Sequence, residues 1–150
     1  MRQIVTFNLL NEEMGLDISC VREILKPQKI HPLPKAPDFI EGVINLRGRI
    51  IAVIDLRKKL GIRAMEDRSK IQIIICRIKK FIVGLIVDSI SEVTTLTEQD
   101  VQPEPEVVSM QIEESFVSGI ARLGERVITI LDLEEIFTEN EATKLAKIKQ

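Results

Sequence analysis

The amino-acid sequence predicts a mainly β protein that contains a duplicated small unit. Short segments rich in β-branched residues recur along its 150 residues, which is typical of strands. No long amphipathic helices alternate with these segments, so a parallel α/β sheet is disfavoured and barrels or a sandwich are favoured. Two stretches of the chain also align without a gap, which indicates an internal repeat.

The predicted elements begin with a strand over Ile4–Leu9 and a second strand that contains Gly15. Ile18–Leu25 is predicted as a short helical turn. A loop with several prolines follows, because proline cannot donate a hydrogen bond within a central strand. The remaining β-branched segments predict the strands Ile50–Ile54, Ile71–Ile75, Phe81–Val87 and Val127–Leu131.

The C-terminal part of the chain is predicted to be helical. Asp132–Asn140 is expected to form a short helix directly after the last strand. Glu139–Lys149 is a charged tail with apolar residues near helical spacing, which predicts a second short helix.

The repeat pairs Phe39–Leu60 with Phe116–Phe137 over 22 positions, seven of them identical. A weaker match around a glycine precedes each copy. A half of roughly 70 residues would bury little surface alone, so the halves are expected to share a hydrophobic interface. We predict two pseudo-symmetric subdomains, over about residues 4–60 and 70–137, and a helical tail over about 139–150.

Residues kept in both copies are expected to serve the shared fold. Gly42 and Gly119 are predicted to lie at a β-bulge or to adopt a positive φ. Asp55 and Asp132 each follow an apolar strand and precede a leucine, which suits a turn or a helix cap. These aspartates are therefore interpreted as structural rather than catalytic.

Residues found in one copy only are candidates for a unique surface. In the first copy Arg47 precedes Gly48, which is suited to a tight turn, and Arg47 is then expected to project from it. The second copy has Gly124 in place of Arg47. Spacing alone leaves two interpretations of Arg47 open, a recognition residue or a solvated hairpin charge.

Composition argues against nucleic-acid binding. The formal net charge is −2 and the isoelectric point is near 5.6, whereas proteins that neutralise many phosphates carry a basic excess. The chain has no Trp and no Tyr and only five Phe, so bases would find almost nothing to stack on.

The sequence also lacks the motifs that are typical of enzyme active sites and metal sites. The single histidine, His31, begins the proline-containing loop segment 31–34 and is interpreted as a loop residue, and no phosphate-binding loop or zinc-binding helix motif occurs. Cys20 and Cys76 are far apart in sequence and are interpreted as buried thiols, with a disulfide as the alternative. The chain begins without a secretory pattern, so a cytoplasmic protein without cofactor or metal is expected.

Several segments together resemble the CheW family of chemotaxis coupling proteins. The segments that carry the resemblance are Phe39–Arg57, Gly15–Ile18, Val21–Ile24, Leu33–Pro37, Gly84–Asp88, Ser91–Val93 and Ile130–Leu133. Their order is specific to this family, and the resemblance runs from about Ile4 to Phe137. Ala52 stands where the family often has proline, and Met14 where it often has an aromatic residue; both are interpreted as packing variations.

The resemblance implies a single CheW-like domain over residues 1–150, made of two intertwined five-stranded SH3-like β-barrels. It also implies a non-catalytic adaptor. Such an adaptor joins the regulatory domain of a CheA-type histidine kinase to the cytoplasmic tip of methyl-accepting chemoreceptors, and it meets the membrane only through these receptors.

By motif match, the resemblance places receptor binding in a groove of the first subdomain. The predicted receptor-binding residues are Val21, Glu23, Ile24, Gly42, Ile44, Asn45, Leu46, Arg47 and Gly48. Apolar members are expected to supply contact area to a receptor helix. Glu23 and Arg47 either contact the receptor at the rim or pair with each other. Val5 and Ile18 are expected to contact the kinase, with core positions as the alternative.

Overall fold

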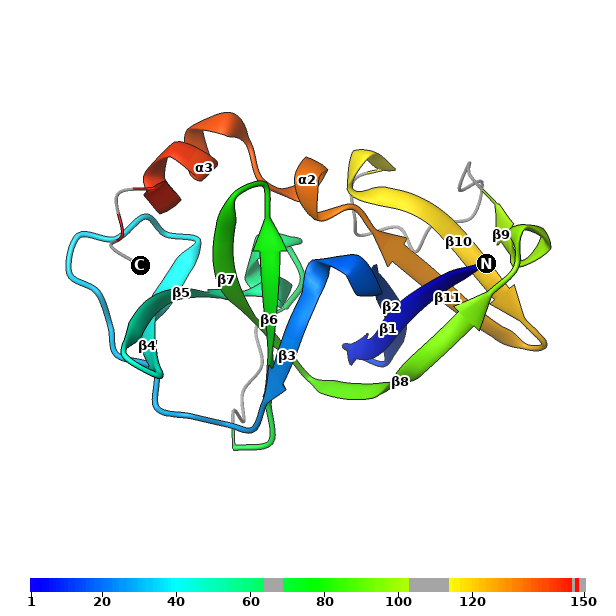
Figure 1. The fold of residues 1–150 in the computed structure, drawn as a ribbon, viewed down its shortest axis with the longest axis horizontal. Coiled ribbons are helices and arrows are strands. Elements are labelled where there is room, and N and C mark those ends of the chain that lie inside the picture. Colours follow the sequence, from blue (N-terminus) through cyan, green and yellow to red (C-terminus); the bar gives the residue numbers. More distant parts are fainter. Residues whose placement is uncertain (64–68, 103–113, 147, 149–150) are drawn as a thin grey trace.

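The structure is a computed structural model that describes residues 1–63, 69–102, 114–146 and 148. Two sheets form two lobes that lie side by side (Figure 1). This confirms the mainly β fold class. The first lobe has the strand order β3-β6-β7-β5-β4, and the second has the order β8-β1-β2-β11-β10-β9.

The strands of the first lobe are β3 (Val21–Leu25), β4 (Ile40–Leu46), β5 (Arg49–Asp55), β6 (Gln72–Ile78) and β7 (Phe81–Val87). Those of the second are β1 (Arg2–Leu9), β2 (Glu12–Asp17), β8 (Ser89–Leu96), β9 (Val101–Gln102), β10 (Val117–Leu123) and β11 (Arg126–Leu131). The α-helices are α1 (Leu56–Lys59), α2 (Leu133–Ile136) and α3 (Glu139–Ala146). Short 3₁₀ turns cover Ile18–Cys20, Glu98–Asp100 and Glu114–Phe116. Among the described residues, no helix is long and apolar enough to cross a membrane.

The lobes do not follow the division into residues 4–60 and 70–137. Strands β1 and β2 from the first half join β8 to β11, whereas β6 and β7 from the second half join β3, β4 and β5. Each lobe therefore combines strands of both halves. Sequence adjacency specifies the antiparallel hairpins. It does not specify that β5 pairs in parallel with β7, and β11 with β2, across the halves.

The predicted pseudo-symmetry is confirmed strand by strand. β5 lies between β4 and β7, and β11 lies between β10 and β2. Val53 of β5 is in register with Gly84, and Ile130 of β11 is in register with Gly15. Both β4 and β10 carry a register shift immediately before their shared glycine, as expected for a bulge.

The expected helical turn over Ile18–Leu25 is only partly correct. Its first three residues form a 3₁₀ turn, but Val21–Leu25 is strand β3. Half-buried Val21, Glu23 and Leu25 alternate with exposed residues, which is the two-residue period of a strand. The expected C-terminal helices are present as α2 and α3, while residues 147, 149 and 150 of the predicted tail lie outside the described part.

The first lobe has the expected five strands, whereas the second has one strand more than expected. The second lobe has a sixth, two-residue strand, β9, which pairs with β10. At the equivalent edge of the first lobe, His31 forms a single bridge to Val43 of β4. His31 thus pairs through its backbone with a sheet edge.

The hydrophobic core confirms that the halves share an interface. The largest cluster of buried side chains includes Phe7 and Leu16 of the second lobe, Ile54 and Leu85 of the first lobe, and Phe137 after α2. Each lobe also has its own smaller interior cluster. Burial of apolar surface therefore holds the lobes together as one unit.

A charged contact also ties the lobes together where the chain crosses from β7 to β8. Arg57 of α1 donates through Nε to Oδ1 of Asp88 at 2.8 Å and through Nη2 to Oδ2. Oδ2 of Asp88 also accepts from the backbone N of Leu10, in the β1–β2 turn of the second lobe, at 2.9 Å. Arg57, Asp88 and Leu10 therefore join three chain segments from both lobes.

We expect Gly42→Ala to destabilise the protein by about 1–3 kcal/mol, because a Cβ there would lie 2.4 Å from the His31 carbonyl oxygen. That oxygen accepts from the Val43 backbone N at 2.8 Å, so it cannot move without losing this bond. Urea unfolding measures the loss. Gly119→Ala is the matched control, since a Cβ there would lie 2.9 Å from the Val101 side chain and 3.2 Å from the nearest carbonyl oxygen, that of Gln102. Equal losses of stability in both variants would show that the His31 carbonyl oxygen does not make Gly42 especially intolerant of a Cβ.

Candidate functional site

The first lobe carries a groove between β3 and the β4–β5 hairpin. It has a volume of about 390 Å³. Its floor consists of Ile51, Ile75 and Ile82, which are at most 9% exposed. Its rim is formed by Arg22, Glu23, Leu46, Arg47 and Arg49. We call this set of residues the first-lobe groove; it combines an apolar floor with a charged rim.

The β4–β5 turn explains why Arg47 projects at this rim. Leu46 and Arg49 are the last paired residues, so Arg47 and Gly48 form a two-residue loop with φ values of +51° and +85°. Positive φ at both positions matches the right-handed twist of a hairpin. Asn45 fixes the turn, because its Oδ1 accepts from the Gly48 backbone N at 2.9 Å.

Glu23 and Arg47 pair with each other across the groove, which was one of the two expected arrangements. Arg47 Nη1 lies 3.3 Å from Glu23 Oε1, and Nη2 donates to Oε2. The hydrogen-bonded guanidinium holds the pKa of Glu23 below its usual range. The Arg47 side chain nevertheless remains 70% exposed and free to meet a partner.

Of the predicted receptor-binding residues, Glu23, Leu46 and Arg47 line this groove, and Asn45 and Gly48 belong to the turn at its rim. Ile24, Asn45 and Gly48 are exposed, and Val21 and Leu46 are half-buried. Two members of the predicted set do not offer side-chain contact area. Ile44 is 1% exposed and belongs to the first-lobe interior, and Gly42 is buried beneath His31. The β4 alternation directs both positions inward.

Sequence reasoning missed five residues of the groove: Arg22, Arg49, Ile51, Ile75 and Ile82. The repeat contained a usable signal for one of them. Ile82 lies two residues before Gly84, whereas Glu13 lies two residues before Gly15 in the other half. A polar residue exchanged for an apolar one at equivalent positions indicates that the two lobes present different surfaces there.

The two predicted kinase contacts have different environments. Val5 is 2% exposed within β1, which is the core position given as the alternative to a kinase contact. Val5 is paired on both sides, with Leu16 of β2 and Val93 of β8. Ile18 is 37% exposed in the turn between β2 and β3 and remains available.

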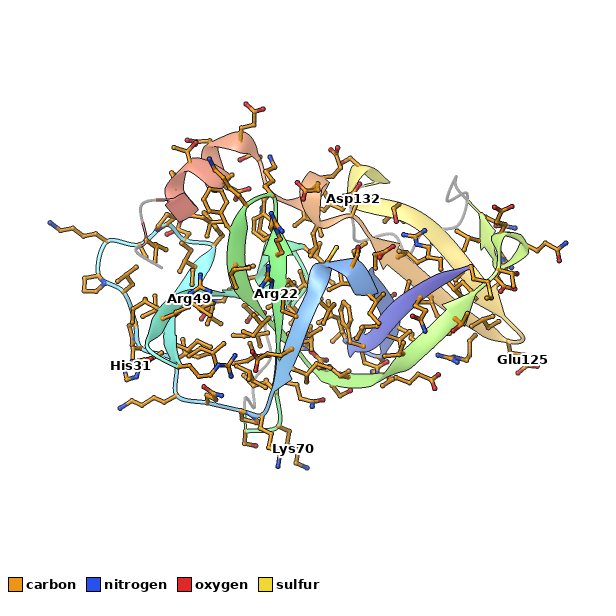
Figure 2. The ribbon with its side chains drawn as sticks, in the orientation of Figure 1. Arg22, His31, Arg49, Lys70, Glu125 and Asp132 are labelled. Carbon is orange, nitrogen blue, oxygen red and sulfur yellow. The ribbon has the colours of Figure 1, made fainter. Side chains whose placement is uncertain are left out.

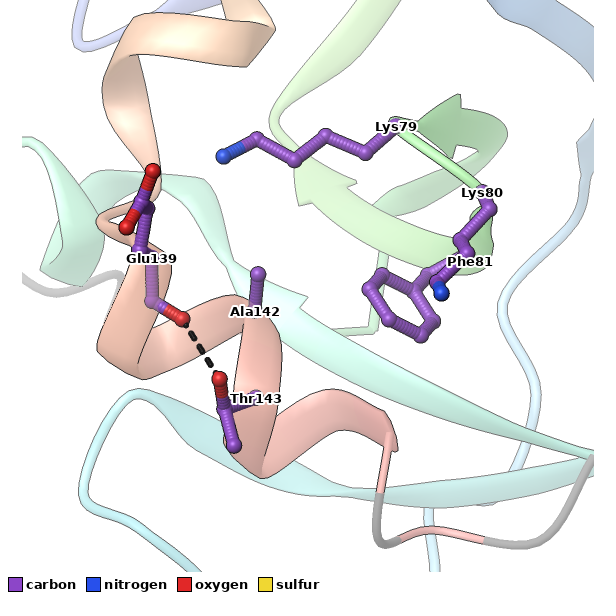
Figure 3. Close-up of a pocket in the computed structure, with 6 residues that line it drawn as sticks. All are labelled: Lys79, Lys80, Phe81, Glu139, Ala142 and Thr143. Carbon is purple, nitrogen blue, oxygen red and sulfur yellow. Dashed lines mark hydrogen bonds between the residues drawn. The ribbon is translucent and has the colours of Figure 1, made fainter.

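A larger hollow lies elsewhere on the first lobe, between the β6–β7 turn and α3 (Figure 3). Its volume is about 630 Å³, and Phe81 and Ala142 contribute apolar surface to it. The ammonium group of Lys80 lies 5.9 Å from the ring centroid of Phe81. None of the residues predicted to bind a partner lines this hollow.

Both cysteines are free thiols. Cys76 is buried and Cys20 is half-buried, and burial raises the pKa of each thiol. These environments favour packing over thiolate chemistry, as expected for buried thiols.

Comparison with known proteins agrees with the fold and with the family resemblance of the sequence. Residues 3–141 match the family model of the CheW-like domain. The chain is 34% identical to the chemotaxis protein CheW of Rhizobium meliloti, over 93% of this chain and 90% of that protein. It is 35% identical to the chemotaxis protein CheW of Treponema pallidum, over 97% and 88% of the two chains.

A solved structure gives the same result in three dimensions. The crystal structure of the scaffolding protein TtCheW from Thermoanaerobacter tengcongensis superposes with a TM-score of 0.83 and 42% identity, covering 93% of this chain and 94% of that one. The family match, the curated relatives and the shared fold agree over nearly the whole chain. The chain therefore belongs to the CheW family of non-catalytic chemotaxis adaptors.

Proposed function

We propose that this adaptor couples a CheA-type histidine kinase, through the kinase's regulatory domain, to the cytoplasmic tip of methyl-accepting chemoreceptors. Family membership supports the adaptor role, and the fold shared with a scaffolding protein supports binding rather than catalysis. The protein acts in the cytoplasm at the inner face of the membrane, which it reaches only through the receptors.

The first-lobe groove is the observation that carries the receptor part of this proposal. A chemoreceptor tip is a helical hairpin, and an amphipathic helix binds by placing apolar side chains into a groove. Leu46 offers apolar contact beside the isoleucine floor. Glu23 and Arg47 supply charges at the rim, which set orientation and specificity more than affinity.

Reconstitution tests the proposal directly. A receptor cytoplasmic fragment, the kinase and this protein are mixed, and kinase autophosphorylation and co-sedimentation are measured. We expect receptor-dependent activation of the kinase only when all three components are present. Activation that is equally strong without this protein would contradict the coupling role.

For the kinase contact, we expect Ile18→Glu to weaken kinase binding about tenfold, because a charge would replace an exposed apolar side chain. The melting temperature should stay close to that of the wild type. Val5→Glu is the contrasting variant and should lower the melting temperature strongly, because Val5 is buried. Unchanged kinase affinity in Ile18→Glu, measured by titration calorimetry, would place the kinase contact elsewhere.

A further inference from the structure

The second lobe provides an internal reference for the first-lobe groove. Because the lobes are pseudo-symmetric, each groove residue has an equivalent in the other lobe. Arg49 corresponds to Arg126, since both are paired with a leucine at the end of a hairpin. Ile82 corresponds to Glu13, two residues before the glycine of β7 and of β2.

In the second lobe the hairpin arginine is fully engaged within the protein. Arg126 donates to Glu13 through Nε at 3.1 Å and through Nη2 at 2.6 Å. Its Nη1 lies 2.9 Å from Oε1 of Glu92, the equivalent of Glu23. One arginine is thus neutralised by two carboxylates, and this lobe has no excess positive charge at that place.

The first lobe has the equivalent arginine, Arg49, but no carboxylate among the described residues is paired with it. Ile82 replaces Glu13, and Glu23 is engaged by Arg47 instead. Within the described part of the chain, Arg49 makes no ion pair or hydrogen bond through its side chain, and it is exposed. The replacement therefore contributes to the apolar floor and at the same time leaves a guanidinium beside it.

Arg22 adds a second unneutralised charge. The β3–β6 ladder pairs Val21 with Cys76 and Glu23 with Ile75, so Arg22 lies at a bulge. Bulges redirect side chains, and Arg22 lines the groove together with its neighbour Glu23. Its equivalent in the second lobe is Ser91, which receives a hydrogen bond from Asn8 at 3.3 Å.

Figure 2 shows Arg22 and Arg49 on the first lobe, with Glu125 at the outer end of the second. The rim of the first-lobe groove contains three arginines and one glutamate, and the glutamate is already paired with Arg47. Two guanidinium groups beside an apolar floor are thus left for a partner. Guanidinium groups bind carboxylates in a bidentate geometry, which favours a carboxylate as their complement.

We infer that the first-lobe groove selects a receptor helix that carries carboxylate side chains beside its apolar stripe, and that Arg22 and Arg49 determine this specificity. The inference rests on the proposed receptor function of the groove. It adds the charge of the partner and two residues that receptor recognition was not expected to use. Charges of this kind steer association and make the affinity dependent on salt.

Titration of the full-length protein with a receptor cytoplasmic fragment at several NaCl concentrations tests the inference. We expect the double variant Arg22→Ser/Arg49→Gln to bind about tenfold more weakly at low salt and to lose most of the salt dependence. Arg122→Gln, an exposed arginine of the second lobe, is the matched control and should bind like the wild type. On the receptor side, changing one groove-facing carboxylate to its amide should add little to the loss in the double variant.

The outcomes separate this inference from the function on which it rests. If the double variant binds like the wild type while Arg47→Ala is defective, the groove binds the receptor but the carboxylate preference is wrong. If the double variant and Arg47→Ala both bind like the wild type, the groove itself is not the receptor site. If Arg122→Gln is as defective as the double variant, the effect is one of net charge and the inference is overturned.

Discussion

Replacement of Asp88 by alanine is expected to lower the free energy of unfolding by about 2–4 kcal/mol. Asp88 and Arg57 are only 18% and 11% exposed, so removal of the carboxylate leaves a largely buried guanidinium without its carboxylate partner, although Nη1 still donates to the Arg63 carbonyl oxygen at 3.1 Å. It also removes the acceptor for the Leu10 backbone N in the other lobe. Chemical denaturation followed by circular dichroism measures the loss.

The second lobe supplies the control for this prediction. Glu134 of α2 is the equivalent of Arg57, and its Oε1 accepts from the Lys79 backbone N at 2.9 Å in the matching turn. Glu134 is exposed, so Glu134→Ala should cost less than about 1 kcal/mol. Arg57→Met should be about as harmful as Asp88→Ala, and the two losses should not add. Equal losses in Asp88→Ala and Glu134→Ala would contradict a special role for the pair at the crossover.

The strands could largely be predicted from the sequence, because the residue preferences that favour them act within each short segment. Runs such as Phe81–Val87 are rich in β-branched residues, and β7 has these bounds. The capping aspartates were predictable for the same reason. Asp55 and Asp132 each accept from the backbone N two residues later, at the start of α1 and α2. The strand β3 was missed because its short, mixed pattern fits a helical turn as well as a strand.

The exchange of strands between halves could not be predicted from the repeat. Both copies carry the same apolar pattern, so the pattern alone would allow either β5 or β11 to pair with either β7 or β2. Which pairing forms depends on the crossover at Asp88 and on the shared core, and both are long-range properties. The repeat predicts how many units form but not which strands belong to each.

The candidate site was predictable only in part, for a related reason. The resemblance located the β4–β5 turn, and the opposite charges of Glu23 and Arg47 allowed for their pairing. The groove floor depends on which side chains meet across three strands. Ile51 is far in sequence from Ile75 and Ile82, so their convergence becomes visible only in the folded chain.

Arg47→Ala is expected to weaken receptor-dependent kinase activation by about tenfold or more, with a melting temperature close to that of the wild type. The side chain is 70% exposed and packs into no core, so folding loses little when it is removed. At the same time Glu23 loses its partner and becomes an unpaired carboxylate at the rim, which disfavours a receptor helix that carries carboxylates.

Two further variants distinguish a recognition role from a backbone effect at this turn. Arg47→Gly copies Gly124 of the second lobe, and it tolerates the positive φ of +51° better than alanine does. It should therefore be as defective in activation as Arg47→Ala while being at least as stable. Glu92→Ala removes one partner of Arg126 but leaves Glu13 in place, so activation should stay near the wild-type value. Activation is measured at limiting protein concentration, where a loss of affinity is not masked by excess. Wild-type activation by both Arg47 variants would show that the receptor does not bind at this rim of the groove.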